Sequence, residues 1–401
     1  MRYLMKPLFV LCSLFFFNLS LSARPIVKSS ISFYMEKLEI NYSPEMIIVD
    51  KKRKVVCTKN KCLEKFYAKM KEGPYQVLLR DLMKHRDDLQ LNDWLYAKLV
   101  RKAVDKVYIN DKELHKALVW WFLLNESGYD CRITVSELVH VFLYAPTKEK
   151  MIDMASFSED GKKFYNLTAK IYNVDTRIAV FNKPKFIANP EGKNFSFSLE
   201  KMPNLTPNPV AKKITFQYKG EPKEITVNVD KVVQEILIDY PKFDEMGMMN
   251  ASLSATLDES LRTELGKLME GKSQREQLEV LASFTRSAFK YKWDWDVYDK
   301  EQPMFAEQVF HSKYSDHEDR CALYFYLVKT MLGLPMIVIT HYNNNMTLGV
   351  VMDEKMKRSF NYKGKNFTIC DPTHPTSTGE IGRYPNGMTK NTASVLGEYG
   401  M

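Results

Sequence analysis

The sequence Tyr314-Ser315-Asp316-His317-Glu318-Asp319-Arg320-Cys321, with the apolar run that follows it, determines the fold of the C-terminal part of the chain. Asp316 can cap a helix, and Asp319 places a second carboxylate in the first turn, where the helix dipole favours it. Residues 322–332 are apolar nearly all round, which predicts a buried helix, and Gly333 is suited to end it. The segment 336–340 is rich in β-branched residues and predicts a strand. The sequence therefore predicts a chemical group presented at the N-terminus of a buried helix.

The start of the chain has the three-part layout of a secretory signal peptide. Arg2 and Lys6 precede an apolar run at 9–17, and small residues extend to Ala23. The apolar run is too short to span a bilayer. We therefore expect cleavage after residue 23 and an exported protein, periplasmic or secreted, with no transmembrane segment in the mature chain.

Composition restricts the class of partner. The chain has 401 residues, which predicts two or three domains, and its 45% apolar content is ample for packed cores. Removing Arg2 and Lys6 leaves 58 − 2 = 56 basic residues against 49 acidic ones, a mild excess. No basic face with interleaved aromatic residues is recognisable, so we expect no nucleic-acid partner.

Five cysteines remain in the mature chain, and an odd number leaves at least one unpaired in an oxidising compartment. They are Cys57, Cys62, Cys131, Cys321 and Cys370. Cys57 and Cys62 flank a short polar loop and can close a disulfide. The pairing of the others stays open.

The order of patterns predicts an α+β protein with three regions. Residues 24–159 form an N-terminal α+β region, which begins with an extended segment to about residue 75. Residues 160–240 alternate apolar and polar side chains on both sides of Gly220, which predicts a hairpin within a β domain, interpreted as a sandwich. Residues 245–401 form a C-terminal domain, a helix bundle packed on an antiparallel sheet.

The N-terminal region repeats the pattern of the C-terminal one. An apolar helix at 117–124 is followed by Gly128 and by two strand patterns, with Lys112 in the place that His317 takes later. The N-terminal region is thus a candidate for a degenerate second copy. The alternative is that buried helices followed by strands are common in α/β proteins.

Residues 273–390 resemble a bacterial transglutaminase-like domain, which has the papain-like cysteine fold. The resemblance rests on a helix leading to Tyr291-Lys292, on Ser315 to Arg320, on the helix ending at Gly333-Leu334-Pro335, and on Cys370-Asp371-Pro372-Thr373. It implies a nucleophilic cysteine at the helix N-terminus, whose thiolate is favoured by the dipole and by a histidine. It also implies that this histidine starts the second strand and is oriented by an aspartate on the third.

The chain departs from that triad at two of its three positions. His317 occupies the nucleophile position, and an imidazole cannot form a thioester. Asn345 occupies the base position, and an amide cannot take up a proton. Only Asp371 matches. We therefore expect a pseudoenzyme without acyl transfer or peptide hydrolysis.

By the same resemblance, we expect the inherited cleft to bind a peptide or protein. The residues expected to line it are Trp293, Trp295, Glu318, Asp319 and Arg320. The identity of the ligand and the oligomeric state are open. A third interpretation is a scaffold for a surface complex.

The competing interpretation is an active cysteine hydrolase or acyltransferase of the peptidase or transglutaminase class. It would use Cys321 with His341 and Asp371, although Cys321 lies a full turn into the apolar helix, where a structural cysteine is usual. His317, Asp319, His311 and His341 can be considered as metal ligands, but their spacing matches no standard site. We expect no metal and no cofactor.

Overall fold

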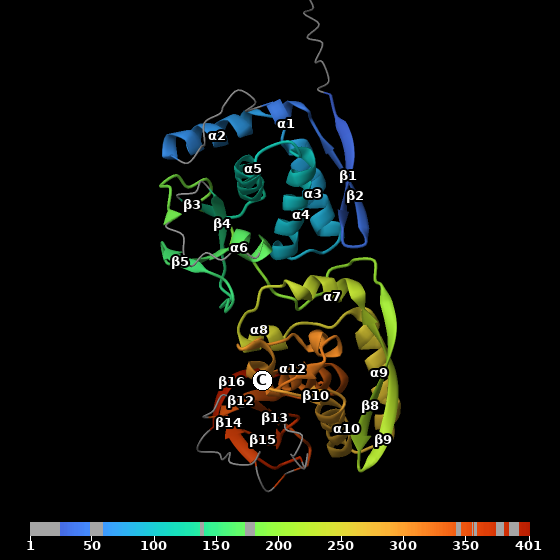
Figure 1. Cartoon of the computed structure of the whole chain (residues 1–401). Coiled ribbons are helices and arrows are strands. Elements are labelled where there is room, and N and C mark those ends of the chain that lie inside the picture. Colours follow the sequence, from blue (N-terminus) through green and yellow to red (C-terminus); the bar gives the residue numbers. More distant parts are fainter. Residues whose placement is uncertain are drawn as a thin grey trace, which may run out of the picture.

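The computed structural model describes residues 25–48, 59–136, 140–172, 181–341, 346–354, 356, 359–373, 381–384 and 393–401. The expected signal peptide, Cys57 and Asn345 lie outside these residues. The described chain is a mixed α+β protein with two halves, one blue to green and one yellow to red, that lie one above the other (Figure 1).

The N-terminal half begins with a β-hairpin, continues with helices and ends in a sheet. Its first elements are β1 (Val27–Phe33), β2 (Glu36–Tyr42), α1 (Glu45–Ile48), α2 (Asn60–Glu72), α3 (Gln76–Asp88), α4 (Asp93–Val107) and α5 (Glu113–Glu126). Those that follow are β3 (Arg132–Ser136), β4 (Val141–Pro146), β5 (Ser156–Glu159), β6 (Lys162–Asn166), α6 (Leu167–Tyr172) and β7 (Phe181–Asn182). The extended segment expected before residue 75 is wrong, because β1, β2 and α2 form there. The sequence hid this hairpin because its turn contains no glycine, and Tyr34 itself adopts a φ of 53°.

The C-terminal half has the same general order. It comprises β8 (Pro209–Tyr218), β9 (Glu221–Asp230), α7 (Lys231–Ile238), α8 (Glu245–Met249), α9 (Ala255–Met269), α10 (Gln274–Ser287), β10 (Lys290–Tyr291), α11 (Asp294–Tyr298), the 3₁₀ helix η1 (Ala306–Phe310) and β11 (Tyr314–Ser315). It continues with α12 (His317–Leu327), the π-helical turn η2 (Val328–Leu332), β12 (Met336–His341), β13 (Met346–Val350), β14 (Ser359–Tyr362), β15 (Lys365–Cys370) and β16 (Ala393–Tyr399).

Each half contains one five-stranded antiparallel sheet, and the two sheets have the same topology. The strand orders are β5-β6-β4-β3-β7 and β14-β15-β13-β12-β16. In the N-terminal sheet, β3 pairs with β4, the hairpin β5-β6 joins through β6 to β4, and β7 pairs with β3. In the C-terminal sheet, β12 pairs with β13, the hairpin β14-β15 joins through β15 to β13, and β16 pairs with β12.

The predicted hairpin around Gly220 is confirmed, but the β-sandwich expected at 160–240 is wrong. β8 and β9 form a two-stranded sheet, whereas β6 and β7 belong to the N-terminal sheet. Alternate hairpin side chains such as Phe216 and Val227 are buried in the core of the C-terminal half, with α9 and α10 against them. Alternation shows that one face is covered, and here helices cover it instead of a second sheet.

α12 forms as the sequence predicts. The Asp316 side chain accepts a hydrogen bond from the Glu318 N–H at 3.2 Å, and Asp319 accepts one from the Asp316 N–H at 3.1 Å. These two bonds make a capping box, which satisfies donors that a helix start leaves open. Every residue from 322 to 327 is buried, and the π-helical turn ends at Gly333, whose φ is 64°.

Among the described helices, none is both long enough and apolar enough to cross a membrane.

Aromatic rings of the C-terminal half extend the apolar core of the N-terminal half. The Phe305 ring from the C-terminal half lies 5.6 Å from the Tyr240 ring and 5.5 Å from the Phe243 ring, centroid to centroid. Tyr240 donates a hydrogen bond to the Phe197 carbonyl at 2.8 Å, and all four rings are buried in the same apolar cluster as the N-terminal helices. This contact fixes the position of the chain that links the halves.

Candidate functional site

His317 is the first residue of α12 and is nearly enclosed. Its ring packs edge-on against Trp293, with 5.1 Å between centroids. Its Nδ1 lies 4.0 Å from the Asp316 Oδ2, and its Nε2 lies 3.8 Å from the Glu318 Oε1. The helix therefore presents an imidazole, held between two carboxylates and an indole, at the position where the resemblance would place a nucleophile.

Cys321 lies one turn further on and is fully buried. Burial raises the pKa of its thiol well above the usual value, and the nearby Asp371 acts in the same direction. Within the described residues, no hydrogen bond or ion pair joins Cys321 to His341. Cys131 and Cys370 are also buried free thiols, whereas Cys62 is disulfide-bonded.

His341 ends β12 and also faces inward. Its Nε2 forms a hydrogen bond of 3.1 Å with the Thr347 Oγ1, and burial lowers its pKa. Asp371 follows β15, and its Oδ1 accepts hydrogen bonds from the backbone N–H and the hydroxyl of Thr373. The Asp371 Oδ1 therefore stabilises a turn with Thr373, and the base position, Asn345, lies outside the described residues.

Two of the residues expected to line a cleft are structural. Asp319 and Arg320 have no exposed surface. Arg320 donates to the Ser315 Oγ, the Thr373 carbonyl and the Phe289 carbonyl, at 3.2, 2.9 and 2.6 Å. The interpretation of these two side chains as ligand contacts is therefore wrong, since Arg320 instead joins three segments of the C-terminal half.

The two tryptophans, in contrast, are exposed. The side chains of Trp293 and Trp295 are 44% and 59% accessible, and Trp295 donates from Nε1 to the Glu301 Oε1 at 2.7 Å. They lie at the start of α11, next to His317. An open aromatic surface therefore adjoins the N-terminus of α12.

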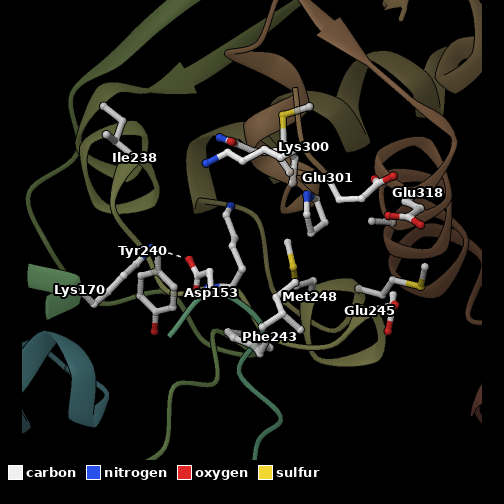
Figure 2. Close-up of a pocket in the computed structure, with 17 residues that line it drawn as sticks. Asp153, Lys170, Ile238, Tyr240, Phe243, Glu245, Met248, Lys300, Glu301 and Glu318 are labelled. Carbon is white, nitrogen blue, oxygen red and sulfur yellow. Dashed lines mark hydrogen bonds and ion pairs between the residues drawn. The ribbon is translucent and has the colours of Figure 1, made fainter. Parts of the chain in front are cut away.

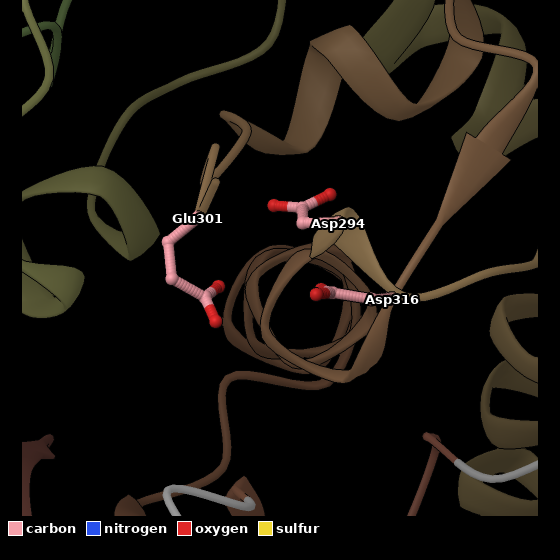
Figure 3. Close-up of side chains that lie close together, drawn as sticks. All are labelled: Asp294, Glu301 and Asp316. Atoms are coloured by element: carbon pink, nitrogen blue, oxygen red, sulfur yellow. The ribbon is translucent and has the colours of Figure 1, made fainter. Parts of the chain in front are cut away.

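Three carboxylates meet beside this surface (Figure 3). One oxygen from each of Asp294, Glu301 and Asp316 lies within 4.8 Å of the others. Burial raises the pKa of Asp294 to about 6 and also raises that of Asp316. Glu318 adjoins the group, and burial together with Asp316 raises its pKa to about 8. Among the residues that the structure describes, this acidic group could hold a cation, and it contains none of the histidines considered from the sequence.

The sequence identified Asp316 only as a helix cap, and it missed Asp294, Glu301 and Asp316 as a group. The aromatic-acidic segment 291–296 is the signal that could have included Asp294. Glu301 had no signal, because its proximity depends on the path of the chain after α11.

A cavity of about 530 Å³ opens between the two halves, and Glu301 belongs both to its lining and to this acidic group (Figure 2). Glu301, Glu318 and Ala322 line it from the C-terminal half, and Asp153 and Lys170 line it from the N-terminal half.

Comparisons with protein-family models, with curated proteins and with solved structures found no match to this chain.

Proposed function

We propose that the protein is an exported, catalytically inactive relative of the transglutaminase-like enzymes, and that it binds a peptide or protein segment at the start of α12. The observation that carries this proposal is the contact between His317 and Trp293 at the helix N-terminus. An imidazole occupies the place of the reactive sulfur there, and an exposed aromatic surface lies beside it.

The burial of Cys321 supports the absence of catalysis. A thiol attacks as its thiolate, and enclosure in an apolar core disfavours that charge. The Cys321 side chain has no exposed surface, and its pKa is raised rather than lowered. The alternative cysteine enzyme would need this sulfur at the surface and activated by a base.

The exposure of Trp293 and Trp295 supports binding. Tryptophan buries a large area and is enriched among the residues that dominate binding energy at interfaces. Two neighbouring indoles left open to solvent, beside three carboxylates, suit an extended segment that offers apolar and polar groups in alternation.

Selection from a peptide-display library on residues 24–401 tests this proposal. Peptides that are selected should bind the Trp293→Ala variant at least about tenfold more weakly in fluorescence-polarisation titrations, as expected for a central aromatic contact. Ile109→Ala is the matched control, because Ile109 is a 67% exposed apolar residue in the N-terminal half. Failure to select any peptide, or equal binding by the Trp293→Ala variant, would overturn the proposal.

The absence of catalysis is tested separately. We expect no peptide hydrolysis and no incorporation of a fluorescent amine into casein by the purified protein. Turnover that disappears in a Cys321→Ser variant would show that the enzyme interpretation is correct.

A further inference from the structure

The cavity between the halves has an acidic wall and a basic wall. Glu245, Glu301 and Glu318 lie on one side in Figure 2, and Asp153 and Lys170 lie on the opposite side, where they form an ion pair. Lys242 and Lys300 also line the cavity. Between the charged groups the lining is apolar, from Phe243, Met248 and Met304.

Lys242 provides a buried positive charge in this lining. Only 9% of the residue is exposed, its Nζ donates to the Gln308 Oε1, and the ammonium lies 4.6 Å from the centre of the Phe305 ring. In the described part of the chain, no carboxylate forms an ion pair with it. Burial lowers its pKa to about 8. Asp153 is the nearby carboxylate that most favours this charge, and it accepts a hydrogen bond from the Lys242 backbone N–H at 2.9 Å. A desolvated ammonium whose Nζ lacks an ion pair would gain from an anionic group bound beside it.

Glu318 provides the opposite charge. Its carboxylate lies near Asp316 and Glu301, and its nearest basic group is the His317 Nε2 at 3.8 Å. Repulsion and burial together keep much of this carboxyl protonated at neutral pH. A cationic group bound here would remove the repulsion and allow Glu318 to ionise.

We propose that this cavity binds a short peptide with free ends, whose carboxylate contacts Lys242 and Lys300 and whose ammonium contacts Glu301 and Glu318. An apolar side chain in the middle of the peptide packs on Phe243, Met248 and Met304. A volume of about 530 Å³ is in the range of pockets that bury small molecules. A phosphate ester would suit the basic wall alone, whereas a ligand with both charges suits both walls.

This site adjoins the surface of the proposed function and shares Glu301 with the carboxylates beside that surface. Glu318 and Ala322 line the cavity, whereas Trp293 and His317 do not. The proposal therefore does not depend on binding at the tryptophans, and the Trp293→Ala variant should bind the short peptide as the wild type does.

Isothermal titration calorimetry with the tripeptide Ala-Leu-Ala tests the site. The zwitterionic form should bind, and the N-acetylated and C-amidated forms should each bind at least about tenfold more weakly, because each lacks one charged hydrogen-bonding end. Equal binding of all three forms, or binding of none, would overturn the proposal.

Variants assign each end to its wall. Lys300→Met should weaken binding of the zwitterion but not of the amide, and Glu301→Gln should weaken binding of the zwitterion but not of the acetylated form. Both residues are exposed, so both variants should fold. Lys102→Met and Glu200→Gln remove exposed charges outside the cavity and are the matched controls.

Proton release provides a second measurement. Binding of the ammonium at pH 7 should release a proton from Glu318, so the measured heat should depend on the ionisation enthalpy of the buffer. The dependence should be smaller in Glu318→Gln. A heat that is independent of buffer in the wild type would contradict the assignment of the ammonium to this wall.

Discussion

Replacement of Arg320 by methionine should destabilise the C-terminal half strongly, although it removes no part of the candidate binding surface. The guanidinium is fully buried and donates three hydrogen bonds, to Ser315, Thr373 and Phe289. It also lies 4.9 Å from the centre of the Tyr291 ring. A hydrogen bond to a charged group contributes about 1.5–3 kcal/mol, and the contributions are not additive. Because two carbonyl acceptors would be left buried, we expect the free energy of unfolding to fall by about 3–5 kcal/mol.

The assay is urea unfolding followed by tryptophan fluorescence, with circular dichroism as a second probe. A loss of this size should also lower the melting temperature of a half of this length by about 10 °C. Arg262→Met is the matched control, because Arg262 is half-exposed and its ion pair with Asp258 should contribute less than about 1 kcal/mol. A loss below about 1 kcal/mol in Arg320→Met would refute the structural role assigned to this arginine.

Three further predictions follow from burial. Iodoacetamide at pH 8 should alkylate Cys321 at least about a hundredfold more slowly in the native protein than in urea, as measured by mass spectrometry, because only an exposed thiolate reacts; equal rates would contradict its burial. The raised pKa of Glu318, about 8 against 4.5, means that the native state holds a proton that the unfolded chain loses, so its contribution to stability is lost as the pH rises from about 5 to about 8. Urea titrations at pH 5 and pH 9 should therefore show a smaller pH-dependent loss in Glu318→Gln than in the wild type, and an equal loss would be inconsistent with this pKa. Gly349→Ala should cost about 1–3 kcal/mol in the same unfolding assay, since its Cβ would lie 2.8 Å from the Ile337 Cγ1 and 2.9 Å from the Phe367 Cβ; an unchanged midpoint would show that the sheet can relax.

The local signals in the sequence predicted the elements around α12 well. The capping residue Asp316 starts its helix, and Gly333 ends it. These predictions succeeded because each depends on residues within one or two turns of each other. The β-sandwich failed because the sequence of a hairpin does not specify which distant segment covers it.

The candidate site shows the same division. The sequence identified His317 and Trp293, which the fold brings into contact. It assigned Arg320 to a ligand surface by the family resemblance alone. Burial of such a residue depends on acceptors far along the chain, such as the Thr373 carbonyl, and these cannot be located before the fold is known.

The shared strand order of the two sheets is what the predicted duplication would produce, and the duplication itself stays a prediction. The starts of the two buried helices differ in their chemistry. α5 is preceded by Lys112, whose side chain makes no capping hydrogen bond, whereas α12 begins with two buried aspartates in a capping box. The N-terminal half instead supplies Asp153 and Lys170 to the cavity. The residues proposed to contact the two charged ends of the peptide all come from the C-terminal half, and they are Glu301, Glu318, Lys242 and Lys300. A short peptide bound there should therefore stabilise the C-terminal half, which provides its proposed contacts.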